Sequence, residues 1–259
     1  MPGPSAYLLD LDGTLYEGGA AIPGAVESLS RLKRRGTPFR LVTNTTTRSR
    51  AMLVQRLAAY GFEVEAEEIF TATLAGVALI RSAGYRTVAP FVPPGALADM
   101  AGLNLAGGTS GAPPVEAADA VVVGDLGERW TFALMQEAFG HLRAGAVLVA
   151  LSRDKYWSQG GRLTLDAGPF VAGLEFAAGT SAVVAGKPSA TFFASALAIL
   201  GEPAEAVAMV GDDLWSDVEG AQRAGLQGWL VRTGKFRDEL LSHASVTPDR
   251  ILDSVAHLP

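Results

Sequence analysis

Short apolar runs alternate with stretches of helical periodicity along most of the chain. Strands are predicted at short runs of mostly apolar residues, over residues 7–9, 39–42, 182–185, 207–210 and 229–231. Helices are predicted between them, and each ends just before a glycine suited to a C-terminal cap: Gly36, Gly61, Gly84, Gly201 and Gly225. This alternation is typical of an α/β fold with a doubly wound parallel sheet. Such sheets bind ligands at the carboxyl ends of their strands.

The middle of the chain differs in composition from the segments on either side. Prolines and a glycine-rich run interrupt it, and it contains its own predicted strands over 87–92, 120–123 and 147–151 and a helix over 131–143. We interpret residues 84–179 as a second α/β domain inserted into the first. The first domain is then discontinuous and consists of residues 1–83 and 180–259.

Composition narrows the class of protein. Hydrophobic residues make up 49% of the 259 residues, which is enough for a sizeable core. The net charge of −6 argues against a broad nucleic-acid surface. No cysteine is present, so thiol nucleophiles, disulfides and thiolate zinc sites are excluded. Because no apolar run reaches about 18 residues and the N-terminus does not resemble a signal peptide, we expect a soluble cytoplasmic protein without a membrane partner.

Polar residues stand at or just beyond the predicted ends of four strands. They are Asp10 and Asp12, Thr43 and Asn44, Lys187, and Asp212 and Asp213 with Asp217. The carboxyl ends of parallel strands share one edge of the sheet, so these residues are expected to converge. Each group also has an ordinary explanation, as a helix N-cap, a solvated helix start or a turn. All four together, with residue types suited to phosphoryl transfer, favour function.

Asp10 and Asp12 are the most informative of these residues. A buried strand that ends in two carboxylates is costly unless the carboxylates have a ligand. Alternate positions followed by a tight turn at Gly13 place both side chains near the strand end, beside backbone N–H groups. Such a place suits a divalent cation and a phosphoryl group, whereas a common Asp-Gly turn is the ordinary alternative.

The sequence resembles the haloacid dehalogenase (HAD) superfamily. The matching segments are Asp-Leu-Asp-Gly-Thr-Leu at 10–15, Val-Thr-Asn at 42–44, Gly-Lys-Pro at 186–188 and Gly-Asp-Asp-Leu-Trp-Ser-Asp at 211–217. Gly-Pro-Phe-Val at 168–171 and Ala-Gln-Arg-Ala-Gly at 221–225 resemble the class IIA branch, which includes NagD-type phosphatases and nitrophenylphosphatases. Within it, the sequence is most similar to the phospholysine/phosphohistidine inorganic pyrophosphate phosphatase group. The resemblance implies a Rossmann-like core with an inserted C2-type α/β cap.

The spacing of the motifs supports this branch. Asp10 and Thr43 are 33 positions apart, which leaves room for one helix and one strand, whereas 144 positions separate Thr43 from Lys187. A cap domain fits only in the second interval, the position that defines a C2 cap. A phosphomutase would carry its usual cap in the first interval, and the dehalogenase branch typically lacks a residue equivalent to Asp12. Both activities are therefore disfavoured.

The resemblance implies a Mg²⁺-dependent phosphatase that hydrolyses a small phosphorylated substrate through an aspartyl-phosphate. Asp10 would attack phosphorus, and Asp12 would serve as general acid and then general base. Mg²⁺ would bind Asp10, the backbone carbonyl of Asp12, and Asp212, because it prefers hard oxygen ligands.

The same resemblance assigns the remaining residues. Thr43, the N–H of Asn44 and Lys187 would hold the phosphoryl oxygens. Asp217 would orient Lys187 or a metal-bound water. Asp213 is expected either to support this arrangement or to lie on the surface.

The substrate stays open, because small phosphate esters, nucleoside monophosphates, pyrophosphate and phosphoramidates all suit these motifs. A catalytically silent binding or regulatory protein on the same fold is the alternative. The resemblance also implies a homodimer through the cap, for which the sequence itself shows no interface. The basic and aromatic segment 152–157, with Gly160-Gly161 after it, is either a loop over the active site or an ordinary surface loop.

Overall fold

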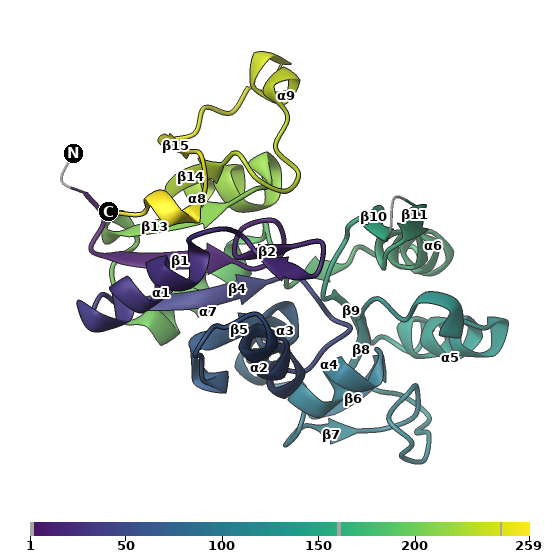
Figure 1. Ribbon diagram of the computed structural model, residues 1–259. Helices are drawn as coiled ribbons and strands as arrows, with labels where there is room; N and C mark the ends of the chain where they lie inside the picture. Colours follow the sequence, from purple (N-terminus) through teal and green to yellow (C-terminus); the bar gives the residue numbers. More distant parts are fainter. Residues whose placement is uncertain (1–2, 160–161, 244) are drawn as a thin grey trace. The chain divides into compact units, whose positions relative to one another are not determined.

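The computed structural model describes residues 3–159, 162–243 and 245–259, and the paired glycines at 160–161 lie outside this part. Two compact units are present, and each has its own parallel sheet (Figure 1). The first unit comprises Met1–Thr43, Leu53–Phe70 and Lys187–Pro259, and the second Asn44–Met52 and Thr71–Gly186.

The first unit is built on a six-stranded sheet in the order β15-β14-β13-β1-β4-β5. Its strands are β1 (Ala6–Asp10), β4 (Phe39–Thr43), β5 (Ile69–Thr71), β13 (Val207–Gly211), β14 (Gln227–Val231) and β15 (Arg250–Leu252). β1 pairs in parallel with β13 on one side and with β4 on the other. Just after β1, the short strands β2 (Tyr16–Glu17) and β3 (Ala20–Ala21) form an antiparallel hairpin.

Helices cover both faces of this sheet. They are α1 (Ala25–Arg34), α2 (Arg50–Ala59), α7 (Ala190–Leu200), α8 (Gly220–Arg223) and α9 (Asp238–His243), with single turns η1 (Ala66–Glu68), η3 (Ala204–Ala206) and η5 (Val255–His257) and the π-type turn η4 (Leu214–Glu219). Successive strand residues point to opposite faces, so Tyr7 and Leu9 pack with Leu29 of α1 and Leu57 of α2. On the other face, η4 packs against Leu230 of β14.

The second unit has a five-stranded parallel sheet in the order β12-β9-β8-β6-β7. Its strands are β6 (Thr87–Phe91), β7 (Asn104–Leu105), β8 (Ala120–Val123), β9 (Val147–Ala150) and β12 (Val183–Val184), and β10 (Tyr156–Gln159) and β11 (Arg162–Leu165) form a separate hairpin. The helices are α3 (Ala72–Ser82), α4 (Pro94–Asp99), α5 (Phe132–Arg143) and α6 (Gly168–Ala178), with η2 (Gly127–Arg129) between β8 and α5. α5 and α6 bury Ala138 and Val171 against this sheet.

The two parallel sheets with their helices confirm the predicted α/β fold with a doubly wound core. The boundaries of the units differ from the predicted ones. β12 was expected in the first domain, but it pairs with β9 of the second sheet, and α3 also belongs to the second unit. β12 consists of two valines, which suit a strand of either sheet equally well. The sequence therefore does not indicate which sheet β12 joins.

No helix in the described part of the chain combines the length and apolarity needed to cross a bilayer.

Candidate active site

Three buried carboxylates meet at the carboxyl ends of β1 and β13. Asp10 is the last residue of β1, and Asp212 follows the last residue of β13. Oxygen atoms of Asp10, Asp212 and Asp217 all lie within 4.8 Å of one another. The three residues are only 7%, 4% and 1% exposed, so the cluster carries acid groups into a space that proteins normally fill with apolar atoms.

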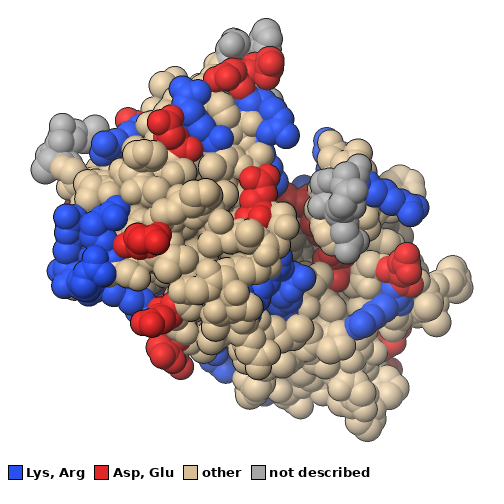
Figure 2. Space-filling model, viewed as in Figure 1, with Lys and Arg blue, Asp and Glu red and all other residues tan. Residues whose placement is uncertain are grey.

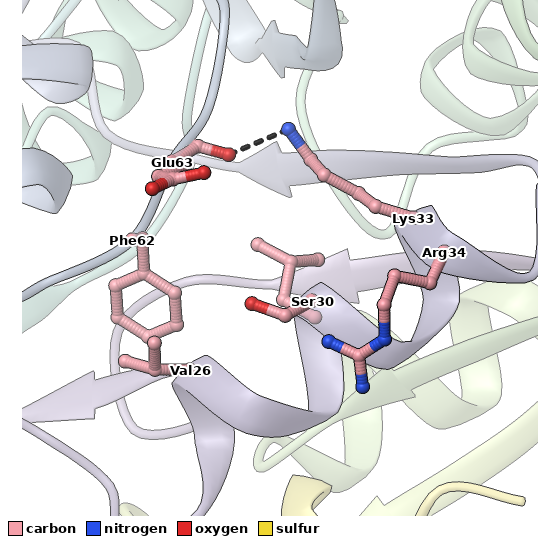
Figure 3. Close-up of a pocket in the computed structure, with 7 residues that line it drawn as sticks. Val26, Ser30, Lys33, Arg34, Phe62 and Glu63 are labelled. Atoms are coloured by element: carbon pink, nitrogen blue, oxygen red, sulfur yellow. Dashed lines mark hydrogen bonds between the residues drawn. The ribbon is translucent and has the colours of Figure 1, made fainter.

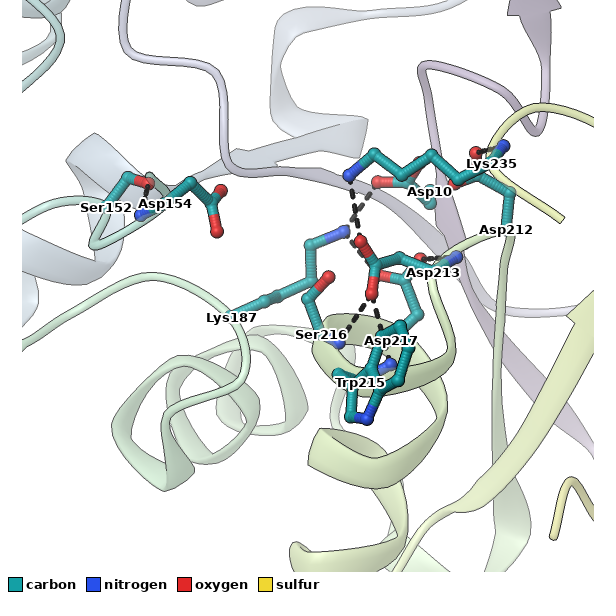
Figure 4. A network of polar contacts seen from close by, with 10 residues as sticks. All are labelled: Asp10, Ser152, Asp154, Lys187, Asp212, Asp213, Trp215, Ser216, Asp217 and Lys235. Atoms are coloured by element: carbon teal, nitrogen blue, oxygen red, sulfur yellow. Dashed lines mark hydrogen bonds and ion pairs between the residues drawn. The ribbon is translucent and has the colours of Figure 1, made fainter. Parts of the chain in front are cut away.

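Lys187 reaches two of these carboxylates. Its Nζ lies 2.5 Å from Asp10 Oδ1 and 2.6 Å from Asp217 Oδ1. Figure 4 marks both contacts with dashed lines. The Lys187 side chain is itself buried, so both contacts are largely shielded from water. The structure therefore brings together four residues that the sequence predicted for one site.

Burial and mutual repulsion raise the pKa values of the carboxyl groups in this cluster. Burial, together with the charges of Asp10 and Asp217, raises the pKa of Asp212 to about 8. Burial also raises the pKa of Asp217 to about 6 and that of Asp10, although Lys187 opposes both shifts. The pKa of Lys187 is raised by Asp10 and Asp217, against the effect of burial, so it remains an ammonium. The ammonium of Lys187 thus contacts two of the three acidic groups, Asp10 and Asp217.

Glycines let the backbone approach these carboxylates closely. Gly13 and Gly234 both have positive φ, at 80° and 61°. A Cβ on either residue would collide with the Asp212 carboxylate, and a Cβ on Gly211 would collide with Asp217. Only glycine satisfies both the backbone conformation and the space at Gly13 and Gly234.

The loop after β14 is a part of the site that the sequence analysis missed. The backbone N–H of Lys235 donates to Asp212 Oδ2 at 2.7 Å, and its Nζ lies 2.8 Å from Asp213 Oδ2 (Figure 4). Thr233 Oγ1 donates to the carbonyl of Gly13 at 2.5 Å. The sequence did offer one indication: this loop follows a predicted strand, so it begins at the same edge of the sheet as the other site residues.

Asp213 has a structural role at the start of η4. Its Oδ1 accepts the backbone N–H groups of Trp215 and Ser216, each at 3.0 Å, which is the geometry of an N-cap. Burial opposes ionisation, but Lys235 and the bonds from Ser216 lower the pKa of Asp213 to about 2. Its own N–H donates to Asp217 Oδ2 at 3.1 Å. Asp213 therefore fixes the turn that carries Asp217.

The other predicted residues lie at strand ends, outside the carboxylate cluster. Asp12 is exposed, and its Oδ2 accepts a hydrogen bond from Tyr16 at 2.9 Å. Thr43 is buried as the last residue of β4, which pairs with β1. Asn44 falls in a stretch assigned to the second unit.

A cavity of about 220 Å³ lies elsewhere, between α1 and the chain after α2 (Figure 3). Figure 2 shows blue side chains gathered over the end of α1, whose last turn carries Arg31, Lys33 and Arg34. Arg31 donates to the carbonyls of Ala256 and Leu258, and Lys33 to that of Glu63. Two of these three basic side chains thus hold the fold together, and no lining residue of the cavity belongs to the carboxylate cluster.

Comparisons with known proteins show the family of this chain. A model described as haloacid dehalogenase-like hydrolase matches residues 7–106, and a HAD-hydrolase-like model matches residues 184–258. Human haloacid dehalogenase-like hydrolase domain-containing protein 2 is 41% identical over 233 residues, which cover 90% of this chain and 85% of the relative. Human phospholysine phosphohistidine inorganic pyrophosphate phosphatase is 35% identical over 262 residues, covering 99% and 93%.

A solved structure, the p-nitrophenyl phosphatase from Archaeoglobus fulgidus, matches with a TM-score of 0.87 at 28% identity and covers 98% of both chains. The two matched segments contain every motif of the cluster, since the first includes Asp10 and the second includes Lys187 and Asp212. The chain therefore belongs to the haloacid dehalogenase-like hydrolases, in the class IIA branch, and is a phosphatase of that family.

Proposed function

We propose that this enzyme is a Mg²⁺-dependent phosphatase that hydrolyses a small phosphorylated substrate through an aspartyl-phosphate on Asp10. The observation that carries the proposal is the buried cluster in which the ammonium of Lys187 contacts Asp10 and Asp217 while Asp212 lies beside them. Such a cluster is expensive to bury, and an anionic substrate with a divalent cation explains why it is kept.

Asp10 is the proposed nucleophile. Its carboxylate oxygen forms a bond to phosphorus as the bond from phosphorus to the leaving oxygen breaks, in line with it. Asp12 gives a proton to that leaving oxygen. In the second step Asp12 takes a proton from water, the water oxygen bonds to phosphorus, and the bond to Asp10 breaks. Asp12 is exposed, as a group that must meet both substrate and water should be.

Lys187, Thr43 and the N–H of Asn44 are proposed to hold the non-bridging phosphoryl oxygens. A fixed ammonium at that place offsets the negative charge that spreads over these oxygens in the transition state. Lys187 is held by two carboxylates in a buried setting, so it needs little reorganisation when the substrate arrives.

The residues present fit a magnesium ion. Three acidic side chains offer hard oxygen atoms within 4.8 Å of one another. Asp10, Asp212 and the backbone carbonyl of Asp12 are proposed as the protein ligands, while Asp217 holds Lys187. The ion would supply charge neutralisation at the phosphoryl oxygens.

The substrate class is proposed from the relatives. Their names include a p-nitrophenyl phosphatase and a phospholysine phosphohistidine inorganic pyrophosphate phosphatase, so phosphate esters, pyrophosphate and phosphoramidates are the compounds to test. A cytoplasmic location and a homodimer through the cap stay predictions.

The decisive experiment measures phosphate release over a panel of these compounds, with and without Mg²⁺. We expect several Mg²⁺-dependent substrates for the wild type and none for Asp10→Asn, because an amide cannot replace the nucleophile. Asp253→Asn is the matched control, since the Asp253 side chain is 80% exposed and lies in a long ion pair, 3.7 Å, with Arg232. Turnover that survives in Asp10→Asn would remove Asp10 as the nucleophile. Silence of the wild type across the panel would favour the binding-protein alternative.

A further inference from the structure

Tyr16 holds the residue to which the proposed function gives the proton transfers. We propose that Tyr16 is a positioning residue that fixes one oxygen of Asp12 and so leaves the other to carry the proton. The inference rests on the proposed function, because it assumes that Asp12 is the general acid and base. Its basis is the hydrogen bond of 2.9 Å from the phenol of Tyr16 to Asp12 Oδ2.

The backbone brings the phenol back to Asp12. After β1 the chain turns, and Leu15 N–H donates to the carbonyl of Leu11 at 2.8 Å. The N–H of Gly13 then donates to the carbonyl of Tyr16 at 2.8 Å, which closes the turn. Tyr16 also opens the hairpin, where it pairs with Ala21 of β3. The contact between the two side chains is therefore set by local backbone bonds.

The ring of Tyr16 is fixed as firmly as its backbone. Only 1% of this residue is exposed. The guanidinium of Arg56 lies 4.7 Å from the ring centroid, and the ring of Tyr60 packs at 5.3 Å. Arg56 Nε in turn donates to the hydroxyl of Tyr60 at 3.2 Å. A phenol locked in this way can hold Asp12 in one orientation without losing much rotamer entropy itself.

The chemistry explains why an exposed carboxyl group needs such a partner. A free Asp12 side chain would place its proton on either oxygen and rotate with respect to the leaving group. The bond from Tyr16 occupies Oδ2, so Oδ1 carries the proton that passes to the leaving oxygen. In the second step Oδ1 takes the proton from water. Tyr16 keeps its own proton throughout, and its contribution is orientation.

The test compares two aryl phosphates that differ in how much their leaving group needs a proton. p-Nitrophenolate leaves readily as an anion, whereas phenolate, with a conjugate acid of pKa about 10, needs more help. For Tyr16→Phe we expect kcat/KM, which reports only the step that expels the leaving group, to fall about tenfold on phenyl phosphate, a part of the effect of a general acid, and less than about threefold on p-nitrophenyl phosphate.

Tyr60→Phe is the matched control, because it makes the same change in the same aromatic cluster without touching Asp12. It should leave both rates near those of the wild type. Arg56→Met gives a second test, because it keeps the hydroxyl of Tyr16 but removes the guanidinium that packs on its ring. It should also lower the rate on phenyl phosphate more than the rate on p-nitrophenyl phosphate, but by a smaller factor than Tyr16→Phe. In an Asp12→Asn background, Tyr16→Phe should have no further effect.

Equal losses of kcat/KM on both substrates would overturn the inference, because the loss would then not depend on how much the leaving group needs a proton. A split of the same size in Tyr60→Phe would overturn it too. Wild type and Asp10→Asn are assayed beside these variants. Activity that survives in Asp10→Asn counts against the proposed function, and it is read separately from the ratio between substrates.

Discussion

At the scale of single residues, Lys187 offsets the negative charge of both Asp10 and Asp217. We expect Lys187→Ala to lower kcat at least about a hundredfold, the size of one lost contact to a developing oxyanion. The variant should also melt earlier, because Asp10 and Asp217 lose their shared partner. Rates are therefore measured well below the melting temperature. Lys33→Ala, which removes an ion pair with Glu68 and a hydrogen bond to the Glu63 carbonyl away from the carboxylate cluster, is the control for lost stability. A rate near that of the wild type would mean that Lys187 does not contact the phosphoryl group.

Gly13 offers a second test at this scale. Gly13→Ala adds a Cβ that would collide with the Asp212 carboxylate and also strains a residue with φ of 80°. Gly18→Ala adds the same atom at φ of 59°, where nothing lies within 4 Å. Both variants should lose about 1–2 kcal/mol of stability from strain, but only Gly13→Ala should weaken Mg²⁺ binding. Calorimetric titration with Mg²⁺ separates the two, and equal affinities would contradict the assignment of Asp212 as a ligand.

At the scale of secondary-structure elements, Asp213 ties the start of η4 to the loop that holds Lys235. Asp213→Ala removes the cap and should cost about 1–2 kcal/mol of stability. Asp213→Asn keeps a capping oxygen and loses only a half-exposed ion pair, so it should cost less than about 1 kcal/mol. Chemical denaturation measures both values. Equal costs would show that the ion pair, and not the cap, is what matters.

Elements with strong local signals were predictable, whereas pairings between distant segments were not. The strand ending in Asp10 and the strand ending in Gly211 are continuous apolar runs, and the structure contains both as β1 and β13. The helix predicted up to Ala224 is really η4 followed by α8. Its first turn is wider because Asp213 caps it and the N–H groups of Asp217 and Val218 both reach the Asp213 carbonyl. The helical spacing of apolar residues does not predict whether an α-helical or a π-type turn forms.

At the scale of the whole molecule, the buried carboxylates link stability to pH and metal. The pKa of Asp212 is about 8 in the folded state, against about 3.9 when unfolded, so the folded protein binds this proton more tightly. Its stabilising contribution is full below about pH 4 and is lost as pH rises through 8.

We therefore expect the melting temperature in EDTA to fall between pH 5 and 8, by more than it does in Asp212→Asn. Saturating Mg²⁺ should raise the melting temperature more at pH 8 than at pH 5, because metal ligands must be ionised. Differential scanning calorimetry at both pH values checks this. A metal effect of equal size at the two pH values would contradict the link.

Much of the site followed from residue types and their order in the chain. The predicted residues Asp10, Lys187, Asp212 and Asp217 do meet. What could not be predicted depends on tertiary contacts: Lys235 reaches Asp212 across the edge of the sheet, and Tyr16 folds back onto Asp12 through a turn. Neither residue type carries a preference for such a partner until the chain has folded.

The order of strands in the first sheet also has a consequence for protein synthesis. β1 and β4 leave the ribosome before β13, which flanks β1 on its other side and comes almost two hundred residues after β1. Asp10 is therefore made long before Lys187, the cation that it contacts. Until the last third of the chain has emerged, the first unit has an open strand edge and a carboxylate without its ammonium. A nascent chain released before β13 is made would carry this exposed strand edge, which is prone to aggregation. Pairing of β13 with β1 therefore protects the folded protein from aggregation.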